Sequence, residues 1–354
     1  MIYFLTFALS ALVFSHACKQ KNIFLLFFSL FFPCLLAGMR DEKIGLDVIT
    51  YVSSSFDLVK GHGLIKYLSF YNEGQIETGY LVLVWLISSF IYSQVFLMFV
   101  MQLIILLPYY LMLYKSKSNI RASIYIFIFL LFMYNTTLCV IRQSMAVSLI
   151  FSAFYFFERK RFILATLLVI WGISTHNSAF LLLAVMIFLY ISSKCFSSKR
   201  IVYLLVAIGL LVVALANYIF LNLDVLAGNE KYLSRLEVTM IDAEGGGGYL
   251  TSIFYFITAS IPLILFYIGR LKSPIYGVLP FIGATLSFVF HSTYFSRLAL
   301  LFMPMLPVSL YYTSMGRSIK TNIFDYILFF LFVGYWIVSI VLRNDWDTYP
   351  YVFG

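Results

Sequence analysis

The chain consists of a series of long apolar runs separated by short polar connections. Most runs are about 16 to 23 residues long, the length of α-helix that crosses roughly 30 Å of hydrocarbon in a bilayer. Hydrophobic residues make up 62% of the 354 residues and charged residues only 11%, so a soluble protein could not cover such a core. The runs also lack the two-residue alternation of a membrane β-strand. The sequence therefore predicts an all-α fold, a polytopic integral membrane helical bundle.

We expect about 12–13 transmembrane helices in a single transmembrane domain that covers residues 1–354. The first run lacks a basic region before it and a small-residue cleavage site before Cys18. We therefore expect it to be the first membrane helix and not a signal peptide. The apolar runs place the helices at 2–17, 23–39, 78–114, 122–134, 138–157, 162–175, 177–191, 201–223, 250–269, 275–290, 297–315 and 323–342.

The charged residues divide the connections into two sets. One set is basic and contains only two of the fifteen acidic residues, Glu158 and Asp325. The positive-inside rule assigns this set to the cytoplasm, so the other thirteen acidic residues lie on the periplasmic side. The net charge of +9 thus reports topology and does not indicate a nucleic-acid partner. The basic connections carry Lys19/Lys21, Lys115/Lys117/Arg121, Arg159/Lys160/Arg161, Lys194/Lys199/Arg200, Arg270/Lys272 and Arg317/Lys320.

The run at 78–114 is too long for one crossing, yet two crossings would break the alternation of charge. We interpret it as one crossing preceded by a re-entrant or interfacial helix near 78–92. The alternative has two full crossings and moves residues 40–77 to the cytoplasm. Residues 40–77 contain six acids and four bases, which favours the re-entrant interpretation.

Two periplasmic loops, at 40–77 and 224–249, are long enough to contribute to a site. The first contains Asp47, Glu73 and Glu77, all able to deprotonate or orient a hydroxyl group. The second ends in four consecutive glycines, a composition that suits either a mobile lid or a disordered connector.

Three ionisable residues interrupt apolar runs: Arg142, His176 and Arg297. An arginine at the centre of a membrane helix costs at least about 2.5 kcal/mol, so it usually has a partner or a function. In the predicted orientation all three lie at the periplasmic ends of their helices. Snorkelling to the lipid headgroups is the alternative explanation for any one of them. Their gathering at one depth favours a common site.

This chemistry suits a polyanionic lipid substrate. The planar fork of arginine binds diphosphate oxygens in pairs, and it stays charged at any physiological pH. A histidine beside arginines would have a pKa lowered by like charge, and could act as a neutral base near pH 7. The sequence has no HExxH, P-loop or GxSxG motif, so we expect no metal or nucleotide cofactor.

A series of short motifs resembles the EpsG family of bacterial polysaccharide polymerases, the Wzy-like proteins that polymerise O-antigen or exopolysaccharide repeats. The resemblance runs from about Gly45 to Tyr351, and it rests on the order and spacing of the motifs. Thr78 stands where the family usually has a proline, which puts a rigid turn at that point in doubt. In chain order the motifs are Ile44-Gly45-Leu46-Asp47 with Tyr51, Glu77-Thr78-Gly79-Tyr80, Ile141-Arg142-Gln143 with Ala146, Thr175-His176-Asn177-Ser178-Ala179, Lys231-Tyr232 with Arg235, Arg297, and Tyr349-Pro350-Tyr351.

The resemblance implies a metal-independent glycosyltransferase at the outer face of the bacterial inner membrane. It would transfer a glycan from undecaprenyl diphosphate to the next lipid-linked repeat unit, with a chain-length regulator as a further partner and with products such as lipopolysaccharide. The candidate catalytic residues are His176, Asp47 and Glu77. The candidate substrate-binding residues are Arg142, Arg297, Arg235, Lys231, Tyr232 and Tyr80.

Two other classes of function remain open. A flippase or transporter for lipid-linked sugars would also need buried charges, but it predicts polar residues through the full depth of the membrane. A membrane acyltransferase that modifies surface glycans would need a histidine on the cytoplasmic side, and only His16 lies near that side.

Overall fold

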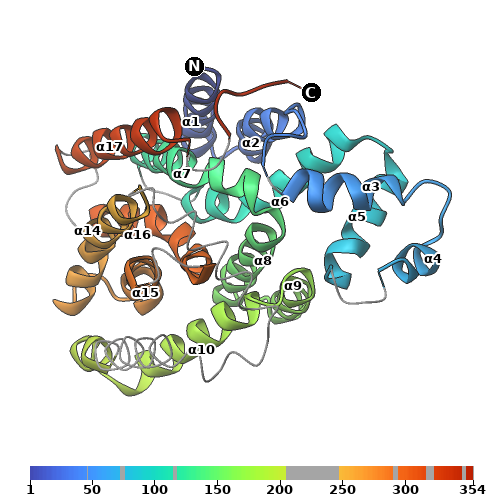
Figure 1. The fold of residues 1–354 in the computed structure, drawn as a ribbon. Helices are drawn as coiled ribbons and strands as arrows, with labels where there is room; N and C mark the ends of the chain where they lie inside the picture. Colours follow the sequence, from blue (N-terminus) through green and yellow to red (C-terminus); the bar gives the residue numbers. More distant parts are fainter. Residues whose placement is uncertain are drawn as a thin grey trace, which may run out of the picture. The chain divides into compact units, whose positions relative to one another are not determined.

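The computed structural model contains two compact units, Met1–Leu183 with Ser318–Gly354 and Ala184–Arg317 (Figure 1). All regular secondary structure in its described part is helical, apart from one isolated bridge between Arg40 and Phe353. The structure describes residues 1–45, 47–71, 76–114, 118–204, 247–289, 294–315, 323–344 and 348–353.

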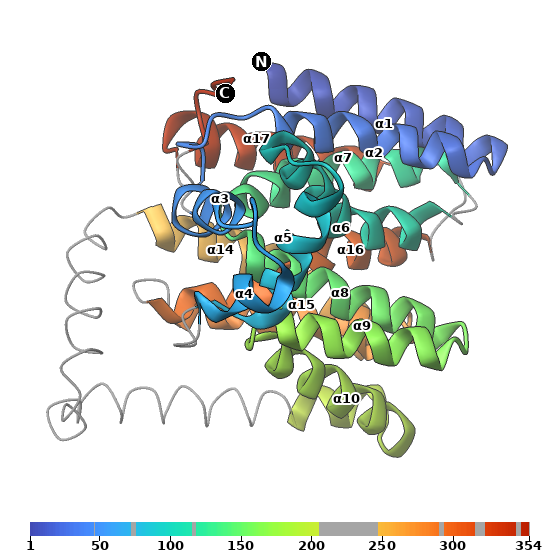
Figure 2. The same cartoon turned by 90° about the vertical axis from the view of Figure 1, so that its right-hand side faces the viewer.

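The first unit is a bundle in which helices distant in sequence pack together. α1 packs against α2 and α7, α6 lies between α2 and α8, and α17 packs against α7. α8 and α9 run side by side in both views (Figures 1 and 2). The helices of this unit are α1 (Ile2–Gln20), α2 (Ile23–Gly38), α5 (Thr78–Phe90), α6 (Gln94–Tyr114), α7 (Asn119–Cys139), α8 (Ile141–Glu158), α9 (Phe162–Thr175) and α17 (Ile323–Trp336), with the π-helix η4 (Ile337–Leu342) following α17.

Helix length and composition confirm a polytopic membrane bundle. Among the described residues, five helical segments are long and apolar enough to cross a membrane, and five further apolar helices have 10–17 residues. Large apolar side chains such as Phe24, Phe90 and Ile163 are more than 80% exposed, as expected for a surface that faces lipid. The five candidate spans are Ile2–Gln20, Gln94–Tyr114, Asn119–Cys139, Leu250–Tyr267 and Ile323–Leu342. The expected count of 12–13 crossings stays a prediction.

The long run at 78–114 divides into two helices, α5 of 13 residues and α6 of 21 residues. A helix of 13 residues is about 20 Å long, which is less than the roughly 30 Å of a bilayer core. This division agrees with a re-entrant helix followed by one crossing. The side of the membrane on which residues 40–77 lie stays a prediction.

The predicted helix boundaries were wrong in two regions of the chain. The spans at 122–134 and 138–157 are in fact α7 and α8, which meet at Val140. The span at 297–315 is not one helix but a series of three: 3₁₀ helices η2 (Tyr294–Leu301) and η3 (Met303–Met305), and then α16 (Leu306–Met315). Pro304 and Pro307 explain the break, because proline lacks the N–H that an α-helix interior needs.

The second unit contains most of α10 (Ala179–Cys195), together with α14 (Gly247–Tyr267), α15 (Pro274–Val289) and the three helices after it. α15 packs against α14, η2 and α16. Most of the predicted span at 201–223 and most of the loop at 224–249 fall outside the described residues.

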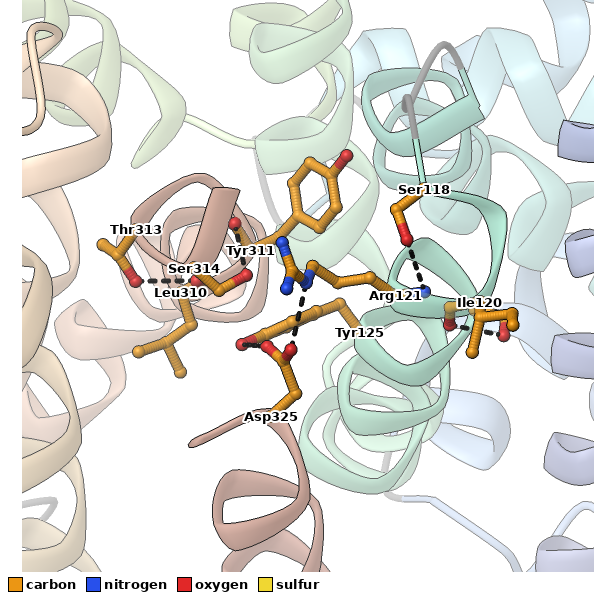
Figure 3. Close-up of polar contacts among 10 residues, drawn as sticks. Ser118, Ile120, Arg121, Tyr125, Leu310, Tyr311, Thr313, Ser314 and Asp325 are labelled. Carbon is orange, nitrogen blue, oxygen red and sulfur yellow. Dashed lines mark hydrogen bonds and ion pairs between the residues drawn. The ribbon is translucent and has the colours of Figure 1, made fainter. Parts of the chain in front are cut away.

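A buried ion pair fastens α7 to α17. Arg121 was predicted to lie in a cytoplasmic connection, but it belongs to the first turn of α7 and is fully buried. Its Nε lies 3.0 Å from Oδ2 of Asp325, which is also fully buried, and the Tyr125 hydroxyl donates to Oδ1 at 3.0 Å (Figure 3). Arg121 and Asp325 therefore join α7 to α17, in addition to being part of the charge pattern that predicts the cytoplasmic face.

Candidate functional site

The loop after α2 lies tightly against the end of α7. Gly45 has a φ of +93°, and a side chain there would collide with the carbonyl oxygen of Leu138. Glycine satisfies both conditions, since it has no Cβ. Two residues later, the half-buried Asp47 begins the π-helix η1 (Val48–Ser53), which continues into α3 (Ser54–Asp57). Residues 48–57 of the predicted 40–77 loop are thus helical, and they follow a turn that lies beside the α7–α8 junction.

Arg142, in the first turn of α8, is held from two sides. Its Nη1 donates to Oε2 of Glu77 at 2.6 Å, and its Cζ lies 3.6 Å from the centroid of the Tyr51 ring. The side chains of Arg142 and Glu77 are 12% and 19% exposed. The Nε of Arg142 is buried and has no hydrogen-bond partner among the described residues. The guanidinium is therefore fixed in position and keeps a donor available for a ligand.

Small residues bring Arg142 and His176 to the same end of the helix pair. A Cβ on Gly172 of α9 would lie 3.2 Å from the backbone oxygen of Ala146 and 3.0 Å from Ile150, both on α8. Arg142 lies one turn before Ala146, and His176 lies one turn after Gly172. Because a short connection joins α8 to α9, the two helices run antiparallel (Figure 2). The close Gly172 contact thus sets both polar side chains at one level.

His176 ends α9, and the turn that follows determines its tautomer. Its backbone N–H donates to the carbonyl of Gly172 at 3.2 Å. Its Nδ1 accepts from the Ser178 backbone N–H at 3.2 Å and lies 2.8 Å from the Ser178 hydroxyl. Because a backbone N–H can only donate, Nδ1 carries no proton. The neutral ring therefore has its proton on Nε2 and presents a hydrogen-bond donor there.

The surroundings of His176 keep the ring neutral. Burial lowers the pKa of His176 below its ordinary value, Glu77 opposes this, and Arg142 adds to it. The expectation from the sequence was a lowered pKa of His176 caused by the like charge of neighbouring arginines. The larger cause is burial, which sequence position alone does not reveal.

The tight contact of α5 with α9 places Glu77 beside His176. A Cβ on Gly79 would collide with the Ser174 side chain and lie 2.6 Å from that residue's carbonyl carbon. Glu77 precedes α5 with an extended backbone, so the helix begins at Thr78 without the proline usual in the resembled family. The buried Tyr80 interacts electrostatically with Asp47 and Arg142.

We predict that Gly79→Ala separates α5 from α9 and lowers the melting temperature, because the new methyl group forces a backbone shift. Overpacking of this kind typically costs about 1–3 kcal/mol. Gly63→Ala is the matched control, since nothing lies within 4 Å of a Cβ at Gly63. The melting temperature would be measured for both variants. Equal behaviour of the two would contradict the close α5–α9 contact.

The structure brings together five of the predicted site residues, all in the first unit: Asp47, Glu77, Tyr80, Arg142 and His176. Arg297 lies in η2 of the second unit with an exposed side chain. Glu73, Lys231, Tyr232 and Arg235 lie outside the described residues.

Sequence reasoning assigned no role to Tyr51, although the residue was part of a quoted motif. Its signal was the spacing of four residues from Asp47, which places the two on neighbouring turns of a helix. That the ring would stack on Arg142 depends on the packing of η1 against α8, which the spacing does not show.

Metal ligands do not cluster in the described part of the chain, where no three His, Cys, Asp or Glu side chains come together. The sequence does contain one DxD pattern, Asp345-Trp346-Asp347, which runs against the expectation that no metal-binding motif is present. These three residues lie outside the described ranges.

The fold and the site define a multi-pass membrane protein with a cluster of ionisable side chains at one end of a helix pair. The chain belongs to the EpsG family, which matches over residues 23–353. This membership links it to exopolysaccharide biosynthesis. No curated protein and no solved structure matches the chain.

Proposed function

We propose that this protein is a polysaccharide polymerase that transfers a glycan from undecaprenyl diphosphate to a lipid-linked repeat unit. The observation that carries the proposal is the fixed guanidinium of Arg142, held by Glu77 and Tyr51 beside a neutral His176. A rigid cation with an available N–H suits a diphosphate group, whose charge grows as it leaves. Family membership in exopolysaccharide biosynthesis supports the same substrate class.

The proposed step exchanges one bond for another. The C1–O bond between the donor sugar and its diphosphate breaks, and a hydroxyl oxygen of the acceptor sugar bonds to C1 with inversion. The hydroxyl proton passes to a base, and undecaprenyl diphosphate leaves with the bonding electron pair. Arg142 stabilises that leaving group.

Among the three candidates, we propose Asp47 as the base. Glu77 is occupied by its 2.6 Å ion pair with Arg142. His176 presents an N–H on its outward nitrogen, because Nδ1 accepts from Ser178. His176 then donates a hydrogen bond to the substrate, and the half-buried Asp47 takes the proton.

We predict that His176→Gln retains most activity, whereas His176→Asn loses it, because only the glutamine amide reaches the position of Nε2. Loss of about a hundredfold or more in both variants would instead identify His176 as the base. Initial rates with purified lipid-linked repeats would distinguish the two cases.

The pH profile is a separate prediction. A lowered pKa means that the folded protein resists protonation of His176 at a pH where the unfolded chain accepts it. Stability should therefore be constant above the ordinary histidine pKa and should fall as the pH drops below it. Activity should persist to a lower pH, because the folded protein keeps the ring neutral until its lowered pKa is reached. In His176→Gln this fall should be weaker, and an unchanged profile would contradict the role of the ring.

The proposal places the site on the periplasmic side of the inner membrane. Reporter fusions should find residues 55 and 235 in the periplasm, and residues 118, 160, 197 and 319 in the cytoplasm. A cytoplasmic residue 55 would support two full crossings at 78–114 and would reverse the orientation of the site.

A deletion strain tests the function itself. If the chain is a polymerase, its loss should abolish long surface glycan and leave a single repeat attached. Loss of all surface glycan, with lipid-linked repeats retained on the cytoplasmic side, would indicate a flippase instead.

A further inference from the structure

Arg40 is a buried arginine that the site described above does not use. It follows α2 directly and is only 4% exposed. Its Nε and Nη1 are both buried, and neither has a hydrogen-bond partner among the described residues. A guanidinium is always charged, and a buried charge without a partner is strongly unfavourable. The unpaired, buried guanidinium of Arg40 therefore requires an explanation.

The groups around Arg40 are neutral and already engaged. It interacts electrostatically with Tyr3, Tyr134, Cys139 and Tyr351, none of which is a carboxylate. The three tyrosine hydroxyls all donate to backbone carbonyls. Two of those carbonyls belong to the last turns of α2. The carbonyls at a helix end are the usual acceptors for an arginine that follows the helix, and here the tyrosines already occupy these two. The surroundings thus leave the N–H groups of Arg40 free to bind a ligand.

The cage around Arg40 is rigid because the C-terminal tail closes it. The backbone of Arg40 pairs with Phe353, and the Asp41 N–H donates to the carbonyl of Val352 at 2.9 Å. Tyr3 donates to the Thr348 carbonyl at 2.7 Å, and the Thr348 hydroxyl accepts from Asn135 at 2.8 Å. The cage is therefore built from α1, α7, the loop after α2 and the tail. Such a setting holds a guanidinium in one orientation.

Cys139, which interacts with Arg40, is also the last residue of α7 and lies three residues before Arg142. Three residues of chain span at most about 11 Å. The two arginines therefore flank the same α7–α8 junction. A reaction between two lipid diphosphates requires cationic groups for both substrates.

We propose that Arg40 binds a phosphate oxyanion, as a second anion site beside the one at Arg142. The phosphate comes either from the lipid-carrier diphosphate or from a bilayer phospholipid. The first source rests on the proposed function, and the second does not. Oxyanion binding by Nε and Nη1 satisfies the two N–H groups that the protein leaves without partners.

The test uses the full-length protein in nanodiscs of neutral phosphatidylcholine, with melting temperature as the readout. Inorganic diphosphate at millimolar concentration should raise the melting temperature by roughly 2–5 °C. Arg40→Met should reduce this increase to the part that arises from binding at Arg142, yet without diphosphate it should melt at or above the wild-type temperature, because it removes an unpaired buried charge. Lys43→Met is the matched control, since it removes an exposed charge from the same loop and should keep the increase.

Two further arms identify the source of the phosphate. If undecaprenyl diphosphate in neutral nanodiscs raises the melting temperature in an Arg40-dependent way, the bound phosphate comes from the lipid carrier. If phosphatidylglycerol nanodiscs alone produce an Arg40-dependent increase in melting temperature, it comes from a bilayer phospholipid. Neither arm depends on polymer formation, so the anion site and the polymerase proposal can fail separately.

Two results would overturn the anion site. One is a lower melting temperature of Arg40→Met in the absence of diphosphate, with the diphosphate effect unchanged, because Arg40 would then act only in packing. The other is a melting temperature of Asp345→Asn or Asp347→Asn that falls below the wild-type value by as much as that of Arg40→Met. A carboxylate of the same chain would then be the partner of Arg40.

Discussion

Arg142→Ala should abolish polymer while leaving a single-repeat glycan and a normal amount of folded protein. The guanidinium is fixed by the Glu77 ion pair and by the Tyr51 ring, so its loss removes a positioned cation from the leaving group. Loss of one such positioned group typically costs about a hundredfold to a thousandfold in rate. Arg142→Lys should recover little, because a lysine cannot contact Glu77, stack on Tyr51 and bind a phosphate at once.

Arg159→Ala is the matched control for this prediction. Arg159 lies at the other end of the same helix, and its guanidinium also lies over a tyrosine, 3.4 Å from the ring centroid of Tyr155. Its replacement should leave polymer length unchanged. Full activity of Arg142→Lys would show that positive charge alone is sufficient. Loss of folded protein in Arg142→Ala would show that the pair with Glu77 is structural.

Asp325→Ala should destabilise the first unit strongly, by about 3–5 kcal/mol. The fully buried Arg121 would lose the carboxylate 3.0 Å from its Nε and would remain charged inside the bundle. Tyr125 would also lose the acceptor of its hydroxyl (Figure 3). The loss should appear as a lower melting temperature of purified protein and as reduced abundance in the membrane.

A double replacement separates the buried charge from the packing. Arg121→Met combined with Asp325→Leu removes both charges and fills similar volume, so it should recover much of the stability lost by Asp325→Ala. Tyr125→Phe should cost less, about 1–3 kcal/mol, since it removes one hydrogen bond to the carboxylate and leaves the ion pair in place. Near-normal stability of Asp325→Ala would contradict the role of the ion pair in joining α7 to α17.

Sequence alone could predict the residues of the site better than their arrangement. Arg142 and His176 are recognisable because ionisable residues in apolar runs are costly. Glu77 and Asp47 were recognisable as carboxylates in a polar loop. Their convergence depends on contacts at Gly79 and Gly172, and a sequence does not show which helix a glycine faces.

Other features depend on tertiary packing in the same way. Arg121 and Arg40 look like ordinary loop charges, and their burial follows only from how α1, α7, α17 and the tail pack. By contrast, the break near Pro304 and Pro307 could have been predicted, because proline disrupts helix interiors. The run at 297–315 is nevertheless apolar along most of its length, and this pattern predicts a single helix despite the two prolines.

The most direct test of the central claim is polymerisation by the purified protein in nanodiscs supplied only with undecaprenyl-diphosphate-linked repeat units. We expect a ladder of longer glycans and release of one undecaprenyl diphosphate for each new linkage, both absent in Arg142→Ala. Movement of the lipid-linked repeats across the bilayer without any new linkage would contradict it, as would an equal ladder from Arg142→Ala.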